Sequence, residues 1–226
     1  MRFKLITTCL FFFIARSIFA QSPDVTFEQV KLSGIGSISV PSIMELQSGF
    51  YKEFSDKRSK ELGFDVSGMI IFQQQGRNDI FTKSPTYARV MIEETLGKPG
   101  DYRKITSKIV LTKQELEILN TLAKTEIENE FQKAGVGLKL LRWDIVSVVT
   151  VNGRNALKVA FLRQLNSNPP VYVETYTIDN FDRQYVLTMS YRQEDASIWK
   201  EVLNTTKNSF TITNIRQAIP KNKRKK

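Results

Sequence analysis

The C-terminal half of the chain alternates apolar and polar residues in four successive segments, a pattern typical of strands with one buried face. Residues 142–151 are followed by Asn152-Gly153, the dipeptide that most strongly favours a two-residue hairpin turn. Residues 155–165, 171–178 and 184–191 continue the alternation, with a second hairpin expected across Asp179-Asn180. We therefore predict an antiparallel meander of four strands over residues 138–192.

A helical pattern precedes this meander and another follows it. Thr112 and Glu115 form a capping-box pair that predicts a helix start, and Gly135 predicts its end. Between them, one apolar stripe recurs at spacings of three and four, at Leu116, Leu119, Ala123, Ile127, Phe131 and Ala134. The second helix is expected to begin near Asp195, which is a plausible N-cap.

The N-terminal half shows shorter extended segments. Residues 25–47 predict strands that are interrupted at Pro41, residues 51–62 predict a short exposed helix, and residues 69–72 and 87–96 predict two further strands. Residues 209–212 predict a final strand or a tight finish. The order of strands, helix, four strands and helix predicts an α+β fold with a central, mainly antiparallel sheet and helices packed on its faces.

The first 20 residues have the layout of a secretory signal peptide. Arg2 and Lys4 give a basic start, a mostly apolar run of about 10 residues follows from Leu5, and Ala20 offers a small residue for cleavage before Gln21. The run is shorter than the roughly 20 residues that a bilayer span needs. The alternative is a buried first strand or helix. We expect a signal peptide over residues 1–20 and a periplasmic or secreted protein.

The rest of the chain is expected to form a single domain over residues 21–219, followed by a basic disordered tail over residues 220–226. Of the net charge of +10, three positive charges lie in the predicted signal peptide and five in the tail, so the body carries only +2. A nearly neutral body gives no expectation of nucleic-acid binding. The alternative to a solvated tail is weak contact with an anionic membrane surface through Lys221, Lys223, Arg224, Lys225 and Lys226.

The available side chains exclude several kinds of catalysis. The chain has no histidine, and its one cysteine, Cys9, lies in the predicted signal peptide. Ser-His-Asp and Cys-His catalysis and zinc sites with the usual ligands are therefore excluded. Ser197 and Lys200 have the S-x-x-K spacing of penicillin-recognising enzymes, but the accompanying motifs are missing. We predict a protein that is not an enzyme and that uses no cofactor or metal.

Four tyrosines of the last two strands of the predicted meander are candidates for a contact patch. Tyr172 and Tyr176 share one face of their strand, and Tyr185 and Tyr191 share one face of the next. If the two faces coincide, the rings form an amphipathic aromatic patch that contacts a partner or a flat ligand. The alternative is a core beneath a helix, with the hydroxyl groups at its rim.

The layout also matches a known family. It combines a long helix, a hairpin at residues 152–156, strands at residues 172–178 and 185–190, and a closing helix that ends in Asn208-Ser209-Phe210. Over residues 112–212 the chain thus resembles the PsbP-like fold, named for the photosystem II extrinsic subunit and found in many small exported bacterial proteins. The resemblance implies an α/β/α sandwich and an accessory or binding role, and it supplies no catalytic residues.

Taken together, these patterns favour an exported, non-enzymatic binding or accessory protein of the cell envelope. It would act through a contact on its sheet face with an envelope protein or a small ligand. The alternatives are an envelope hydrolase that uses paired carboxylates, and a binder of anionic surfaces through the basic tail.

Overall fold

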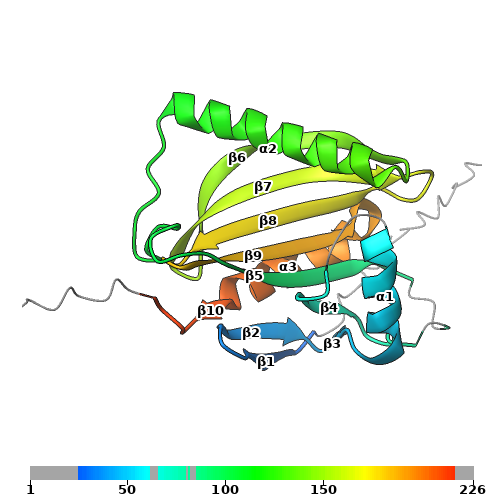
Figure 1. Ribbon diagram of the computed structural model, residues 1–226. Coiled ribbons are helices and arrows are strands. Elements are labelled where there is room, and N and C mark those ends of the chain that lie inside the picture. The colour runs from blue at the N-terminus through cyan, green and yellow to red at the C-terminus, as the bar shows by residue number, and fades with distance from the viewer. Residues whose placement is uncertain (1–24, 62–65, 80, 82–84, 217–226) are drawn as a thin grey trace, which may run out of the picture.

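The computed structural model describes residues 25–61, 66–79, 81 and 85–216 (Figure 1). The predicted signal peptide, residues 1–20, and the predicted tail with Lys221, Lys223, Arg224, Lys225 and Lys226 lie outside the described residues. Within the described ranges the elements, in chain order, are β1 (Phe27–Leu32), β2 (Gly36–Pro41), β3 (Met44–Leu46), α1 (Gly49–Glu61), β4 (Ile70–Gln74), β5 (Ala88–Leu96), α2 (Lys113–Ala134), β6 (Leu138–Val151), β7 (Arg154–Leu165), β8 (Val171–Asp179), β9 (Arg183–Arg192), the single 3₁₀ turn η1 (Gln193–Asp195), α3 (Ala196–Ser209) and β10 (Thr211–Ile212).

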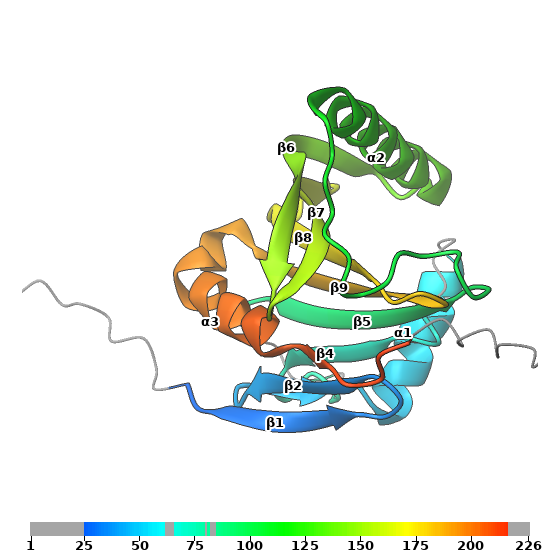
Figure 2. The ribbon, with the colours of Figure 1, turned by 90° about the vertical axis from the view of Figure 1, so that its left-hand side faces the viewer.

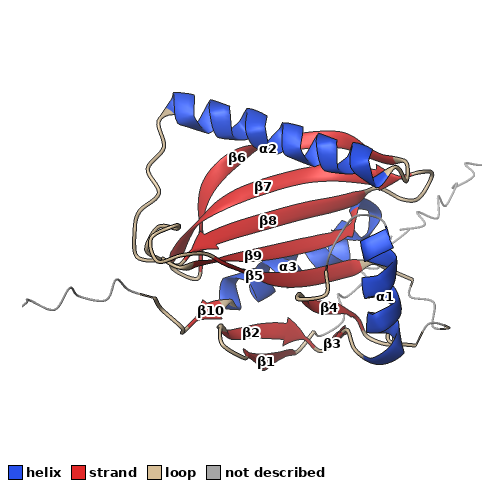
Figure 3. Ribbon diagram, in the orientation of Figure 1, coloured by secondary structure: helices blue, strands red, loops and turns tan. Residues whose placement is uncertain are grey.

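Two antiparallel sheets organise these elements (Figure 3). The larger sheet has seven strands in the order β3-β4-β5-β9-β8-β7-β6, and the smaller has the order β1-β2-β10. The four-strand meander predicted from the sequence is confirmed as β6 to β9. Asn152 and Gly153 both have positive φ angles, 43° and 77°. These are the angles that a two-residue hairpin turn of type I′ requires, so this hairpin prediction is correct.

The second hairpin differs from its prediction because its turn is longer. Asp179 still belongs to β8, and the turn consists of Asn180, Phe181 and Asp182. Phe181 has a φ of 67°, in the left-handed region that glycine and asparagine usually occupy. The sequence pattern therefore located the turn but not the residue that bends it.

The outermost strand of the larger sheet, β6, is irregular. It pairs with β7, and the register shifts between Leu140 and Arg142 and again between Asp144 and Ser147. The shifts lie at Leu141 and Ile145, whose side chains are 46% and 73% exposed. Extra residues of this kind bend a strand and increase its twist.

Helix α2 covers one face of the larger sheet above β6 and β7 (Figure 1). Its predicted capping box is confirmed, because Glu115 N donates to Thr112 Oγ1 at 3.2 Å and Thr112 N donates to Glu115 Oε2 at 2.7 Å. Phe131 packs edge-on against Phe161 of β7, with ring centroids 6.0 Å apart. The helix thus contributes to a small apolar cluster and leaves most of its surface in solvent.

Helix α3 packs on the opposite face of the same sheet, so the sheet lies between two helices (Figure 2). Trp199 and Leu203 are each 2% exposed, and Phe210, just after the helix, is 1% exposed. All three belong to the main core cluster, which also takes residues from β2 and β9. This arrangement confirms the predicted α+β fold with a central, mainly antiparallel sheet.

The start of α3 follows the sequence prediction in position but not in mechanism. Asp195 is the N-cap residue by position, yet its side chain makes no capping hydrogen bond. Instead its Oδ2 accepts a hydrogen bond from Tyr87 N at 2.9 Å. The carboxylate therefore ties the beginning of the helix to the residue before β5.

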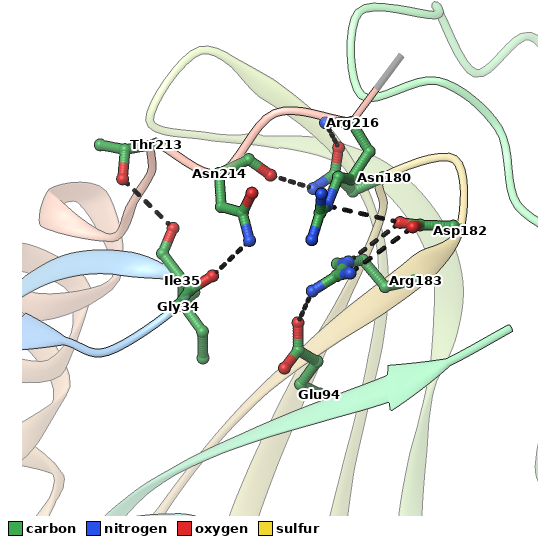
Figure 4. A network of polar contacts seen from close by, with 9 residues as sticks. All are labelled: Gly34, Ile35, Glu94, Asn180, Asp182, Arg183, Thr213, Asn214 and Arg216. Carbon is green, nitrogen blue, oxygen red and sulfur yellow. Dashed lines mark hydrogen bonds and ion pairs between the residues drawn. The ribbon is translucent and has the colours of Figure 1, made fainter. Parts of the chain in front are cut away.

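A polar network joins the β8–β9 turn to the smaller sheet (Figure 4). The Asn180 side chain is fully buried, donates to Asn214 O at 2.8 Å and accepts from Arg216 N at 2.9 Å. Asn214 Nδ2 in turn donates to Gly34 O at 2.6 Å. Arg183 bridges Asp182 and Glu94, at 2.9 Å and 2.6 Å. These contacts anchor residues 213–216 to one end of the larger sheet.

The core position of α3 predicts the effect of truncating its side chains. Leu203→Ala should lower the free energy of unfolding by about 2–5 kcal/mol, because it removes buried methyl groups and leaves a cavity. Ile198→Ala on the same helix is the matched control, since Ile198 is 36% exposed, and it should cost less than about 1 kcal/mol. Urea denaturation followed by circular dichroism measures both changes. Equal losses for the two variants would contradict this packing.

Candidate ligand-binding cleft

A cleft of about 470 Å³ lies between α3 and the strands β6 to β9. The sheet extends sideways beyond the helix here, so part of its face is left open (Figure 2). The cleft is lined by Arg142, Lys158, Tyr172, Glu174, Tyr176, Tyr191, Gln193, Ala196, Lys200, Glu201, Asn204 and Lys207.

Two simple periodicities place these side chains. On β8, every second residue faces the cleft, which gives Tyr172, Glu174 and Tyr176. On α3, Ala196, Lys200, Asn204 and Lys207 follow one another at spacings of four, four and three, which places them on one stripe of the helix. The strand face and the helix stripe thus form the two walls of the cleft.

The structure brings together three of the four tyrosines that the sequence analysis placed in a contact patch. Tyr172, Tyr176 and Tyr191 all line the cleft, and the rings of Tyr172 and Tyr191 meet edge-on with centroids 5.7 Å apart. Tyr185 is fully buried in the main core and lies outside the cleft. It shares a strand face with Tyr191, but six residues of extended chain separate them by about 20 Å. A shared face therefore did not mean a shared site.

Cations lie over the rings that the sequence placed in a contact patch. Arg142 Cζ is 5.3 Å from the centroid of Tyr172. The ring of Tyr176 has two such neighbours, with Lys158 Nζ at 5.9 Å and Lys207 Nζ at 5.5 Å. All three distances are within the range of cation–π attraction. A ligand in the cleft would therefore meet ammonium and guanidinium groups before it met aromatic faces.

Several charged groups of the cleft already have partners. Lys158 Nζ lies 2.5 Å from Glu174 Oε1. Asp144 accepts from the Tyr172 hydroxyl at 2.7 Å and from Arg142 Nε at 3.1 Å. Lys207 Nζ donates to Asn204 Oδ1 at 2.7 Å and forms no ion pair with a carboxylate among the described residues.

The lining as a whole is positive. It contains four cationic side chains and the two carboxylates of Glu174 and Glu201. Lys200 forms no ion pair within the described part of the chain. The sequence analysis placed none of these cations in a binding site and weighed Lys200 only with Ser197, although the helical spacing of Lys200 and Lys207 was an available signal.

The environment shifts the pKa values of three groups in opposite directions. Burial lowers the pKa of the Lys207 ammonium, the charge of Glu174 opposes this shift, and the charge of Lys158 adds to it. Burial raises the pKa of Tyr172, and its hydrogen bond to Asp144 raises it further. Burial and the charge of Glu174 raise the pKa of Tyr176. The tyrosines thus stay neutral hydrogen-bonding groups at any pH at which Lys207 titrates.

Other chemistry predicted or weighed from the sequence finds little support near the cleft. Ser197 is exposed on α3 and does not line the cleft, so it makes no site with Lys200. Within residues 25–216 as described, side chains of His, Cys, Asp and Glu form no group of three or more that would hold a metal ion. No helix among the described residues is both long enough and apolar enough to cross a membrane.

The lowered pKa of Lys207 can be measured directly. In an NMR titration of the lysine side chains, the pKa of Lys207 should lie below the ordinary value for lysine. Lys158→Met should move the Lys207 pKa upward, because it removes a repelling charge and frees Glu174 to attract the ammonium. An unchanged titration of Lys207 in this variant would contradict the coupling of the two lysines.

Comparison with known proteins gives likenesses of structure only. No family model and no curated protein matches the chain. Cyanobacterial PsbP (CyanoP) from Synechocystis sp. PCC 6803 has 12% identity, covering 83% of this chain and 92% of that one, with a TM-score of 0.46. LpqN of Mycobacterium tuberculosis, a protein involved in cell envelope biogenesis, has 12% identity, with 84% and 91% covered and a TM-score of 0.43. PA94 of Pseudomonas aeruginosa, of unknown function, has 11% identity, with 85% and 99% covered and a TM-score of 0.39. A PsbP protein is therefore among the solved structures that are similar to this chain.

Proposed function

We propose that this chain is an exported, non-enzymatic binding or accessory protein of the cell envelope, and that it holds a small anionic ligand in the cleft beside α3. The observation that carries the proposal is the pair of ammonium groups, Lys158 and Lys207, on the ring of Tyr176. Of the two contacts considered from the sequence, with a protein or with a ligand, a concave cleft favours the ligand. Its volume falls within the usual range of small-molecule sites.

The two lysines favour an oxyanion as the ligand group. Burial contributes most to the lowered pKa of Lys207, the charge of Glu174 opposes the shift, and the ammonium groups of Lys158 and Lys207 repel each other. A phosphate or carboxylate group placed between them would accept charge-assisted hydrogen bonds and reduce this repulsion. Lys200, four residues before Asn204 along the same wall, would add a third cation to the site beside Lys158 and Lys207.

The remaining polar groups suit a hydroxylated ligand body. Asn204 and Gln193 supply amide groups, and the tyrosine hydroxyls supply neutral donors because their pKa values are raised. Ring faces are covered by cations, which disfavours a ligand recognised mainly by stacking. A small polyhydroxy compound with one phosphate or carboxylate group fits these features best.

Support for a binding role over hydrolysis comes from the state of the carboxylates. A hydrolase of this type needs one carboxyl group that donates a proton and a second that acts as base or nucleophile. Glu174 is already engaged in an ion pair with Lys158 at 2.5 Å, so this carboxylate of the cleft has a protein partner. Release of product from an envelope glycan by the purified protein would revive the hydrolase alternative.

The anion site is tested with glycerol 3-phosphate as the probe, measured by isothermal titration calorimetry. Lys207→Met should weaken binding about ten- to a hundredfold, which is the usual effect of losing a hydrogen bond to a charged group. Lys113→Met, on the exposed surface of α2, makes the same change of charge and should leave the affinity unaltered. Equal losses in the two variants, or equal binding of uncharged glycerol, would contradict a specific anion site.

The same titration has a predicted pH dependence. Affinity should fall as the pH rises through the alkaline range toward the ordinary lysine pKa of about 10.4, because Lys207 loses its charge as the pH passes its lowered pKa. The phosphate is fully ionised over this range, and Tyr172 and Tyr176 remain protonated. In Lys207→Met the fall should be smaller. An affinity that rises with pH would contradict the role of this ammonium group.

Export is tested separately from binding. Expression of the full chain in a bacterial host should yield a protein in the periplasmic or secreted fraction that begins at Gln21, as read by N-terminal mass spectrometry. Replacing the apolar Leu10 and Phe11 by Lys should retain the full-length chain in the cytoplasm. A mature protein that still begins at Met1 would contradict the signal-peptide prediction.

A further inference from the structure

A second pocket, of about 260 Å³, lies on the other face of the larger sheet, at the end where β6 begins and β7 ends. Neighbouring residues of β8 line the two different sites. Tyr172 faces the cleft beside α3, while Val171 lines the second pocket and packs toward the cluster under α2. Because successive residues of a strand point to opposite faces, the two sites are independent volumes.

Strand register places two arginines side by side in this pocket. Val171 of β8 lies opposite Arg163 of β7 and opposite Arg192 of β9. The three strands are neighbours in the sheet (Figure 1). Residues directly opposite each other share a face, so both guanidinium groups flank the Val171 side chain. Both also line the pocket.

These arginines are poorly compensated. Arg163 forms no ion pair with any residue that the structure describes. Arg192 Nη1 donates to Pro85 O at 3.2 Å and lies 3.8 Å from Glu194 Oε1. The other carboxylate in contact with this region, Asp195, accepts from the backbone of Tyr87.

The surroundings of Tyr87, at the edge of the pocket, are also positively charged. Arg89 lies over its ring, with Cζ 5.7 Å from the centroid. Burial by itself would raise the pKa of the Tyr87 hydroxyl, but the charges of Arg89 and Arg163, a hydrogen bond with Ser190 and the charge of Arg77 together outweigh burial and lower it. The surroundings thus favour negative charge at this point of the sheet.

The other half of the pocket is apolar. Leu138 of β6 pairs with Leu165 of β7, and both side chains line the pocket beside Val171. Leu165 is 38% exposed, which is a substantial apolar surface to leave in water beside two arginines. The pocket therefore presents cations at one end and hydrocarbon at the other.

We propose that this pocket binds an amphiphilic carboxylate of the fatty-acid class. The carboxylate would accept hydrogen bonds from Arg163 and Arg192, whose planar forks suit a carboxylate group. The aliphatic chain would cover Leu138, Leu165 and Val171. This site does not depend on the anion site proposed beside α3, because it uses different residues on the opposite face of the sheet.

The test is calorimetric titration of the protein with dodecanoate below its micelle concentration. Dodecanol and inorganic phosphate serve as probes of the chain and of the charge alone. Dodecanoate should bind, and dodecanol and phosphate should each bind at least about tenfold more weakly. Dodecanol lacks the carboxylate that the arginines would bind, and phosphate lacks the aliphatic chain that would cover the apolar half. Equal binding of dodecanol would overturn the role of the arginines, and equal binding of phosphate would overturn the role of the apolar half.

Variants then assign the binding to this pocket. Arg163→Gln should weaken dodecanoate binding about tenfold or more while preserving the fold, because Arg163 has no ion pair to lose. Leu165→Asn tests the apolar half and should also weaken binding. Arg142→Gln is the matched control, since Arg142 lines the cleft on the opposite face, and it should leave dodecanoate binding unchanged.

A membrane surface is the competing explanation for any affinity toward amphiphiles. Vesicles of phosphatidylglycerol should not co-sediment with the protein more strongly than vesicles of phosphatidylcholine, because a pocket of this size admits a single chain and not a bilayer. Salt-sensitive co-sedimentation that Arg163→Gln abolishes would overturn the fatty-acid proposal. Loss of dodecanoate binding in Arg142→Gln but not in Arg163→Gln would overturn it as well.

Discussion

The position of α3 depends on apolar contacts between the helix and both sheets. Trp199 and Leu203 fill the space between β9 and β2, and Phe210 continues the contact past the end of the helix. Ser209 fixes the same end by polar contacts, because its Oγ accepts from Ser39 N at 2.7 Å and donates to Thr206 O at 2.6 Å. With one side of the helix held in this way, the stripe from Ala196 to Lys207 is left facing the open part of the sheet. The cleft exists because the helix is anchored off-centre.

Alternation along the strands gives the larger sheet two chemically different faces. Toward α3, the strands present tyrosines and charged groups beyond the edge of the helix. Toward α2, Phe161 and Val173 of the strands form a small apolar cluster with Phe131 of the helix, and arginines lie beyond its edge. In both cases the helix covers the apolar part and leaves the charged part open. Candidate sites on both faces therefore follow from helices that are narrower than the sheet they cover.

Sequence reasoning predicted the elements well where short-range rules govern them. The capping box at Thr112, the stop at Gly135 and the Asn152-Gly153 turn all rest on local backbone chemistry, and all are confirmed. The outcome at Asp195 was different, because its carboxylate contacts Tyr87, a residue 108 positions away in sequence. No local rule contains that contact.

The candidate sites were predicted less completely, for the same reason. Alternation correctly put Tyr172 and Tyr176 on one face. It could not tell which part of the strand face lies beside α3, so it did not separate Tyr185 from Tyr191. Lys158 and Lys207 meet on one ring although they belong to different elements, and only the tertiary packing brings them together. The arginines at Val171 required the register of three strands, which a single sequence does not encode in any short motif.

The irregular outer strand β6 has a consequence for how these molecules behave when they are crowded together. A straight strand with unpaired backbone groups invites the strand of a second molecule to extend the sheet, which is a common route to aggregation. In β6 the register shifts at Leu141 and Ile145 divide the strand into short stretches of different direction. A second molecule could match only a few residues of such an edge before losing alignment. The two bulges therefore disfavour edge-to-edge pairing of β6 between molecules, which favours solubility at high concentration.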